Sequence, residues 1–185
     1  MAYILRGYPI PIVVIILQCI LYGYISFVYY NKLPDPVPLR FEKQQAVSFQ
    51  TKQKFFTIHL VTFYLITLVF TLTGILVATR LPARHLRVPG KENWLGVQEK
   101  EKLVKVLSSK YCLWITVFTA QFLLELNTLL YELSLRKNRE LFWFLWVFLC
   151  IYIIEVIITT LIGYFKIRSI GSLQEVEDFQ PSFFI

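Results

Sequence analysis

The chain has 185 residues, 56% of which are hydrophobic and 17% charged, and it carries a formal net charge of +7. Its mean hydropathy is +0.57, and soluble globular domains contain only about 45 to 50% apolar residues. This composition excludes an ordinary soluble domain and indicates a membrane protein, with the lipid bilayer as its first partner.

Four apolar segments are long enough to cross a bilayer, whose hydrocarbon core requires roughly 20 helical residues. Their residues do not alternate between polar and apolar, as in the roughly 10-residue strands of a membrane β-barrel. The sequence therefore predicts an all-α fold, an integral membrane four-helix bundle in a single domain, residues 1–185. We expect the spans at residues 9–30, 55–77, 111–133 and 141–165.

The first span follows one basic residue, Arg6, near the N-terminus. Its apolar run exceeds the core of a signal peptide, about 7 to 15 residues, and no small-residue cleavage site follows it. We expect this span to remain in the protein as a membrane anchor.

The basic residues lie near the ends of the spans rather than on one soluble face, so we do not expect nucleic acid as a partner. Most of them fall in the N-terminal segment, in the loop between the second and third spans, and in the C-terminal tail. Because cytoplasmic loops are enriched in lysine and arginine, we expect both termini to be cytoplasmic.

The loop after the first span contains the proline-rich stretch LPDPVP, residues 33–38. Each proline restricts its own φ and biases the preceding residue towards extended backbone. We therefore expect a stiff extended strut that ends the first helix. It either caps the helix bundle, which is the simpler interpretation, or presents a surface.

The loop between the second and third spans has two parts. RLPARHLRVPGKENWLG, residues 80–96, contains prolines and glycines that favour turns. VQEKEKLVKVLSSK, residues 97–110, mixes apolar and charged positions and predicts a short amphipathic surface helix that leads into the third span. We place Trp94 beside it at the headgroup level. This helix is either a connector or a docking site for a partner.

Two loop motifs resemble those of the bacterial SdpI-type membrane proteins, a superfamily with a domain of unknown function. The first follows the pattern L-P-x-x-[IV]-P-x-H-F, with a lysine before the second helix, and comprises Leu33, Pro34, Val37, Pro38, Phe41 and Lys54. The second resembles N-L-P-N-K-x-Y-W-L and comprises Pro89, Lys91, Trp94 and Leu95. The resemblance covers roughly residues 1–130.

The resemblance implies a helical protein of the bacterial cytoplasmic membrane without catalytic activity. Some relatives act as immunity or signalling proteins against a toxin. The chain departs from the pattern at two places, because Arg40 occupies the position of the family's histidine and Gln44 and Gln45 stand near the position of its glycine. The resemblance therefore implies no active site.

Three ionisable residues fall inside the predicted spans, namely His59, Glu125 and Glu155. A charged group in hydrocarbon costs about 2.5 to 3.5 kcal/mol on insertion, so each is expected to have a partner. In the third span, a spacing of four, three and four places a polar stripe on one helix face, formed by Gln121, Glu125, Thr128 and Glu132. No other span shows a stripe as clear.

A helical rise of about 1.5 Å per residue places His59 at a depth between those of Glu125 and Glu132, which makes a pairing with one of them geometrically possible. Glu155 falls nearer the depth of Gln121. The simpler interpretation of these residues is structural, with hydrogen bonds between helices. The alternative is a proton or cation relay.

Metal, haem and nucleophile chemistry find no support in the sequence. The two histidines, His59 and His85, show no H-x-x-x-H spacing, and Cys19, Cys112 and Cys150 form no C-x-x-C pair. Phosphate-binding loops, dinucleotide fingerprints and nucleophile elbows are also missing from the sequence. We therefore predict no metal, no cofactor and no enzymatic activity.

The fourth span begins with the aromatic-rich stretch LFWFLWVFLCIY, residues 141–152. Some of these aromatic residues lie too deep for a belt at the membrane interface, so some of the rings face lipid or another protein. Lipid exposure and helix packing are the simpler interpretation, and a slot for a pigment, a quinone or a lipid is the alternative.

These observations leave three functions open. The first is an SdpI-like immunity or signalling protein that binds another protein in the membrane. The second is an accessory subunit that stabilises a larger membrane complex through the aromatic fourth span and the surface helix. A weaker alternative is a proton-coupled carrier that uses Glu125 and Glu155.

Overall fold

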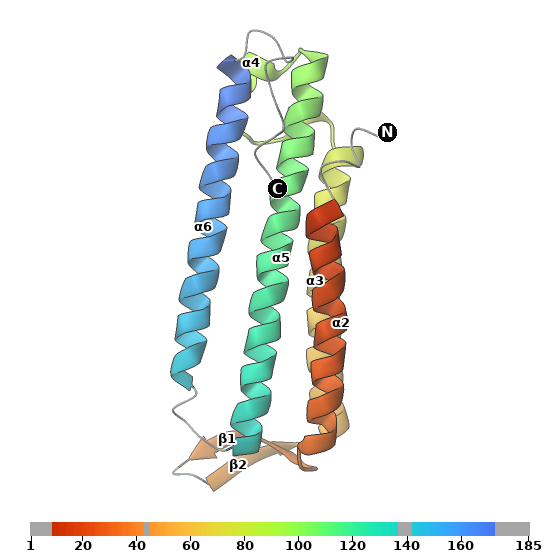
Figure 1. Cartoon of the computed structure of the whole chain (residues 1–185), viewed down its shortest axis with the longest axis vertical. Coiled ribbons are helices and arrows are strands. Elements are labelled where there is room, and N and C mark those ends of the chain that lie inside the picture. Colours follow the sequence, from red (N-terminus) through yellow and green to blue (C-terminus); the bar gives the residue numbers. More distant parts are fainter. Residues whose placement is uncertain (1–8, 43–44, 137–141, 173–185) are drawn as a thin grey trace.

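The computed structural model describes residues 9–42, 45–136 and 142–172. It contains four long helices and one two-stranded antiparallel hairpin (Figure 1). In chain order the elements are α2 (Pro9–Lys32), β1 (Val37–Glu42), β2 (Gln45–Gln50), α3 (Lys52–Thr79), η1 (Ala83–His85), α4 (Lys91–Trp94), α5 (Gln98–Arg136) and α6 (Phe142–Ser172). The long helices are long and apolar enough to cross a membrane, which confirms the predicted all-α fold.

The longest helix, α5, extends well beyond the span that the sequence predicts. Its 39 residues correspond to about 58 Å, against a hydrocarbon core of about 30 Å. A short helix does lie between the second and third spans, but it is α4, and the charged segment from Gln98 onward is the beginning of α5. This segment contains no proline or glycine, so a helix that has started there continues into the span.

The two ends of the molecule are built differently. The hairpin lies at one end, and α4 lies at the other, where α2 also begins and α6 ends (Figure 1). The chain therefore runs along the length of the bundle an even number of times. That both ends of the helical region lie on one side agrees with the expected topology, whose cytoplasmic assignment stays a prediction.

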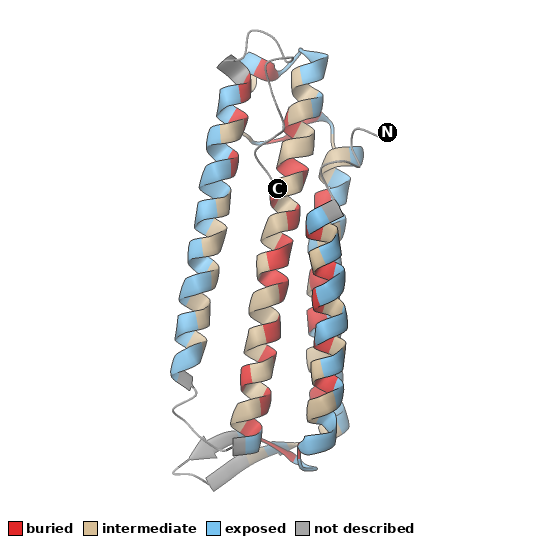
Figure 2. Cartoon of the chain, viewed as in Figure 1, coloured by how far each residue is buried: buried red, intermediate tan, exposed pale blue. Residues whose placement is uncertain are grey.

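Helix α5 occupies the centre of the bundle. It contacts α2, α3 and α6, whereas α6 packs chiefly against α5 and α4. Buried residues follow α5 along much of its length, and α6 is largely exposed (Figure 2). In the most apolar stretch of each helix, 44% of the residues of α5 are buried, against 0% for α6. Most of the surface of α6 is thus left to lipid or to another protein.

The proline-rich loop forms more than the expected strut. After the cis Asp35–Pro36 peptide bond, β1 pairs with β2 in a hairpin that the sequence analysis did not predict. Leu33 and Val37 are buried against the start of α3 and the end of α5, and Ser134 Oγ donates a hydrogen bond of 3.2 Å to the carbonyl of Pro38. This loop caps the bundle.

Candidate functional site

A line of hydrogen bonds joins α2 to α5 inside the membrane-spanning region. Gln18 Nε2 lies 3.2 Å from the carbonyl of Val117 and 3.2 Å from Gln121 Oε1. Nearer the hairpin, the hydroxyl of Tyr131 lies 3.2 Å from that of Tyr22. Without water, such groups must find partners within the protein, so these bonds fix how α2 sits on α5.

The line continues to the hairpin end of the same two helices. Ser26 Oγ lies 3.4 Å from the hydroxyl of Tyr131, and the hydroxyl of Tyr29 donates to Glu132. The contributing residues of α2 are Gln18, Tyr22, Ser26 and Tyr29. Their spacing of four, four and three marks a second polar stripe, which was not predicted from the sequence because two of its members are tyrosines rather than amides or carboxylates.

The predicted stripe of the third span lies on α5 and is half-buried. Gln121 connects to α2 and also donates a bond of 2.6 Å to Glu125 Oε1, one turn away. Thr128 donates its hydroxyl to the carbonyl of Leu124, 2.8 Å away within the helix. Glu132 accepts from α2, so the stripe faces α2 at both of its ends.

In the described residues, His59 does not pair with the two carboxylates that lie at a similar depth. Its Nδ1 lies 2.7 Å from the carbonyl of Phe55, and its ring packs on the Phe55 ring with centroids 4.3 Å apart. Within the described residues it makes no hydrogen bond or ion pair with Glu125 or Glu132. A similar depth does not by itself bring these groups together, because depth does not fix the rotation of α3 about its axis.

Glu155 lies on α6, in the half-buried stripe that faces α5. Within the part of the chain that the structure describes, its carboxyl group has no hydrogen-bond or ion-pair partner. The charged group that acts on it is a second carboxyl group, that of Glu125. Glu155 is thus an ionisable residue in an apolar helix, and its carboxyl group has neither a hydrogen-bond donor nor a cation in the described chain.

Another polar residue of α6, Tyr152, does find a hydrogen-bond partner in the seam, the contact surface between α5 and α6. The Tyr152 hydroxyl lies 3.2 Å from Thr119 Oγ1, and the Tyr152 ring stacks on Phe122 with centroids 4.9 Å apart. One turn from it, Glu155 makes no comparable bond. The α5–α6 seam therefore holds Tyr152 but leaves the carboxylate without a donor.

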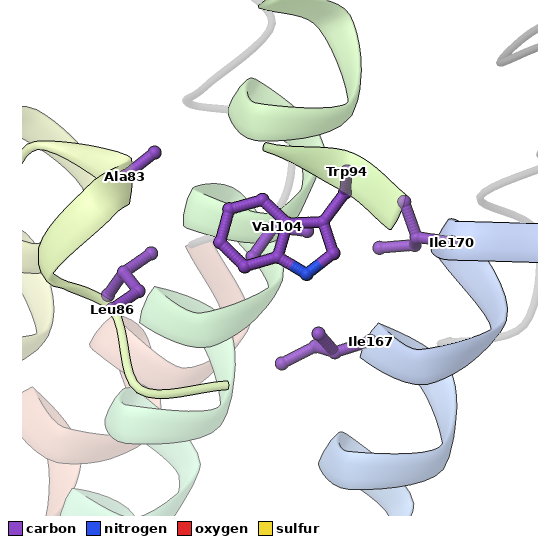
Figure 3. Close-up of a cluster of buried hydrophobic side chains, with 6 residues drawn as sticks. All are labelled: Ala83, Leu86, Trp94, Val104, Ile167 and Ile170. Atoms are coloured by element: carbon purple, nitrogen blue, oxygen red, sulfur yellow. The ribbon is translucent and has the colours of Figure 1, made fainter. Parts of the chain in front are cut away.

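The second loop motif builds a cap at the end opposite the hairpin. Trp94 is fully buried, and its Nε1 donates a bond of 3.2 Å to the carbonyl of Pro89. Figure 3 shows its ring among aliphatic side chains from the loop, α5 and α6, namely Ala83, Leu86, Val104, Ile167 and Ile170. The loop folds over the helix ends and covers Trp94 with protein, and its depth at the headgroup level stays a prediction.

Two glycines permit this fold. Gly90 and Gly96 have φ values of +66° and +92°, which side-chain-bearing residues rarely adopt. They flank α4 and turn the chain on either side of it. Of the remaining motif residues, Lys91 donates to the carbonyl of Arg84, and Leu95 is exposed.

The residues of the first motif also serve the architecture. Pro38 is buried like Leu33 and Val37, whereas Pro34 and Lys54 are exposed. Phe41 belongs to β1, and its side chain lies outside the described residues, as does that of Arg40. Each motif thus caps one end of the bundle, and the two motifs lie at opposite ends of the long helices.

No described group of three or more His, Cys, Asp or Glu residues is placed to hold a metal ion. Cys19, Cys112 and Cys150 are free thiols. The polar residues that the structure does bring together form hydrogen bonds between helices rather than a nucleophile with its base.

Four apolar helices joined by polar seams define the class of this molecule, a multi-pass helical membrane protein. Comparison with family models, with curated proteins and with solved structures gives no match. The SdpI-type resemblance therefore stays a prediction that depends on the two loop motifs alone.

Proposed function

We propose that this chain is a non-enzymatic, SdpI-like protein of the bacterial cytoplasmic membrane that acts by binding another membrane protein through α6, in immunity or signalling. The observation that carries this proposal is Glu155, a carboxylate within an apolar helix that has no hydrogen-bond or ion-pair partner in the described chain. The two loop motifs support the SdpI-like assignment.

The energetic argument concerns the cost of leaving Glu155 without a donor. An acidic residue at the centre of a span costs about 2.5 to 3.5 kcal/mol on insertion scales, and such residues mark functional contacts by default. Flanking residues on the same side of α6, Ile151 and Ile158, are 47% and 51% exposed. A partner helix is therefore able to approach this edge and supply a donor or a cation to the carboxylate.

The accessory-subunit alternative uses the same surface with a different partner. Large aromatic side chains near the start of α6 are exposed, Trp143 by 75%, Trp146 by 54% and Phe144 by 52%. Aromatic residues are enriched where membrane proteins contact each other or the lipid interface. Stoichiometric co-purification with a large complex favours this alternative, and a small complex with a single partner favours immunity or signalling.

The weaker alternative, a proton-coupled carrier, draws on the electrostatic interaction between Glu125 and Glu155. It predicts proton flux in liposomes that contain the purified protein. Replacing Glu125 by Gln is expected to abolish such flux, and a flux that does not differ from that of empty liposomes removes this alternative.

The binding proposal is tested with two matched substitutions, Glu155→Leu and Glu125→Leu, in protein purified in mild detergent from its native membrane. Glu155→Leu is expected to lose the partner while the isolated chain keeps or increases its stability, because an unsatisfied carboxylate is removed. Glu125→Leu is expected to lower stability by about 1 kcal/mol, because Gln121 loses its acceptor, and to keep the partner.

Two results contradict the proposal. One is a partner that remains bound to the Glu155→Leu variant at wild-type stoichiometry. The other is a clear loss of stability of the isolated Glu155→Leu chain, since this outcome assigns the carboxylate a role within the monomer.

A further inference from the structure

A groove of about 290 Å³ lies between α2 and α3, near the hairpin end. It is formed by the last three turns of α2 and the first turns of α3, and its lining includes Gly23, Ser26, Phe27, Phe56, Thr57 and Leu60. Phe27 is 68% exposed, and Thr57 is also exposed, so the groove opens sideways rather than into the bundle. In a membrane, that opening faces lipid.

Side-chain size explains the hollow. Gly23 and Ser26 place no large group between the helices, and Gly23 lets Tyr64 approach until its hydroxyl donates a 2.9 Å bond to the carbonyl of Cys19. On the hairpin side, Tyr30 meets Phe56 edge to face, with ring centroids 5.1 Å apart. The groove is therefore a mainly apolar and aromatic slot, with Gln53 also in its lining, and one of its ends lies near the hairpin.

That end carries positive charge. The ammonium group of Lys52 lies 4.7 Å from the centroid of the Tyr30 ring, and that of Lys32 lies 5.9 Å from the centroid of Tyr29. Neither ammonium forms an ion pair with a described carboxylate. Asp35 also lies in this loop, and its Oδ1 accepts a hydrogen bond of 3.1 Å from the backbone N–H of Lys52.

We propose that this groove binds one acyl chain of an anionic phospholipid, with Lys52 binding the lipid phosphate. Leu60, at the inner end of the lining, lies eight residues from Lys52, or about 12 Å along the helix axis. That distance matches a chain that enters from the headgroup level into one leaflet. The volume falls just below the range of about 300 to 1,000 Å³ typical of sites that enclose a whole small molecule, so it suits part of a lipid.

The lipid proposal does not depend on the function proposed above. The groove lies on α2 and α3, whereas the proposed protein contact lies on α6, and α5 separates the two (Figure 1). A lipid between α2 and α3 adds apolar contact between two helices that contact each other less than either contacts α5. The expected consequence is that bound lipid stabilises the pair.

The test compares two identical substitutions on α3, Thr57→Trp inside the groove and Thr73→Trp on an exposed position outside it. Native mass spectrometry of the purified protein, titrated with phosphatidylglycerol or phosphatidylethanolamine, measures the affinity of the first bound lipid. Thr57→Trp is expected to weaken phosphatidylglycerol binding by about tenfold, because the indole occupies the space of several methylene groups. Thr73→Trp is expected to leave it within about twofold of wild type.

The charge is tested with Lys52→Gln. This variant is expected to lose most of the preference for phosphatidylglycerol over phosphatidylethanolamine while still binding a lipid chain. Circular dichroism and size-exclusion profiles confirm that each variant is folded. Equal binding by the Thr57→Trp and Thr73→Trp variants, or equal affinity of the wild type for the two lipids, overturns the proposal.

Discussion

The two sides of α5 hold their neighbours in different ways. On one side α2 and α3 contact α5 and each other, and hydrogen bonds between side chains run from Gln18 to Glu132. On the other side, among the residues that the structure describes, α6 packs chiefly against α5 and the α4 cap, and Glu155 has no donor there. The difference separates a self-sufficient three-helix core from a fourth helix whose outer surface is available to a partner.

The cap at the α4 end is expected to be the strongest attachment of α6. Trp94→Ala empties a fully buried site against Ile167 and Ile170, so it should lower the free energy of unfolding by about 3 to 5 kcal/mol. The midpoint of thermal unfolding in detergent measures this loss. Trp143→Ala is the matched control, because Trp143 is 75% exposed, and it should change the midpoint little. Equal effects of both substitutions would remove the cap from the account.

The seam between α5 and α6 is expected to be sensitive to one added side chain. A Cβ atom at position 163 would lie 3.0 Å from the ring of Tyr111, so Gly163→Val should push α6 away and cost about 1 to 3 kcal/mol. The distance between α5 and α6 is followed by disulfide formation between cysteines placed at Thr119 and Tyr152. The yield of this disulfide should be lower in the Gly163→Val variant. A cysteine pair at Gln18 and Gln121 should cross-link as before. If both pairs respond alike, α6 is not a separate layer.

A hydroxyl deletion on each side of α5 gives the smallest expected effects. Tyr131→Phe removes the partner of Tyr22 and Ser26, and should cost about 1 kcal/mol. Tyr152→Phe should cost less, because Thr119 keeps its 2.8 Å bond to the carbonyl of Ile115. Chemical denaturation of the two single variants checks the order. A larger cost for Tyr152→Phe would reverse the comparison between the two seams.

The amino-acid sequence predicted the spans well because the length of an apolar run depends on composition alone. The hairpin was not predicted, because the prolines of residues 33–38 favour a loop and one of them lies within the strand that begins at Val37. Depth alone made a pairing of His59 with Glu125 or Glu132 possible, but it leaves helix rotation open, and the described residues show no such pair. The sequence did not indicate that Trp94 is buried, because burial under a folded loop depends on contacts between segments far apart in the chain.

The hydrogen bonds between α2 and α5 depend on two polar stripes, and only one of them was predicted from the sequence. The stripe on α5 was found from the spacing of its amides and carboxylates. The matching stripe on α2 has the same helical spacing, but two of its members are tyrosines, whose hydroxyl groups matter only when a partner is placed opposite. Glu155 was identified from the sequence, and only the structure places it in a seam without a donor.

The most direct test of the account is photo-crosslinking in native membranes. A photoreactive phenylalanine at Ile158, one turn from Glu155 on α6, is compared with the same residue at Leu68, on the exposed surface of α3. The account predicts one discrete protein adduct from position 158, lost when Glu155 is replaced by Leu, and none of that size from position 68. An adduct at position 158 that persists without the Glu155 carboxylate, or lipid adducts alone at both positions, would contradict it.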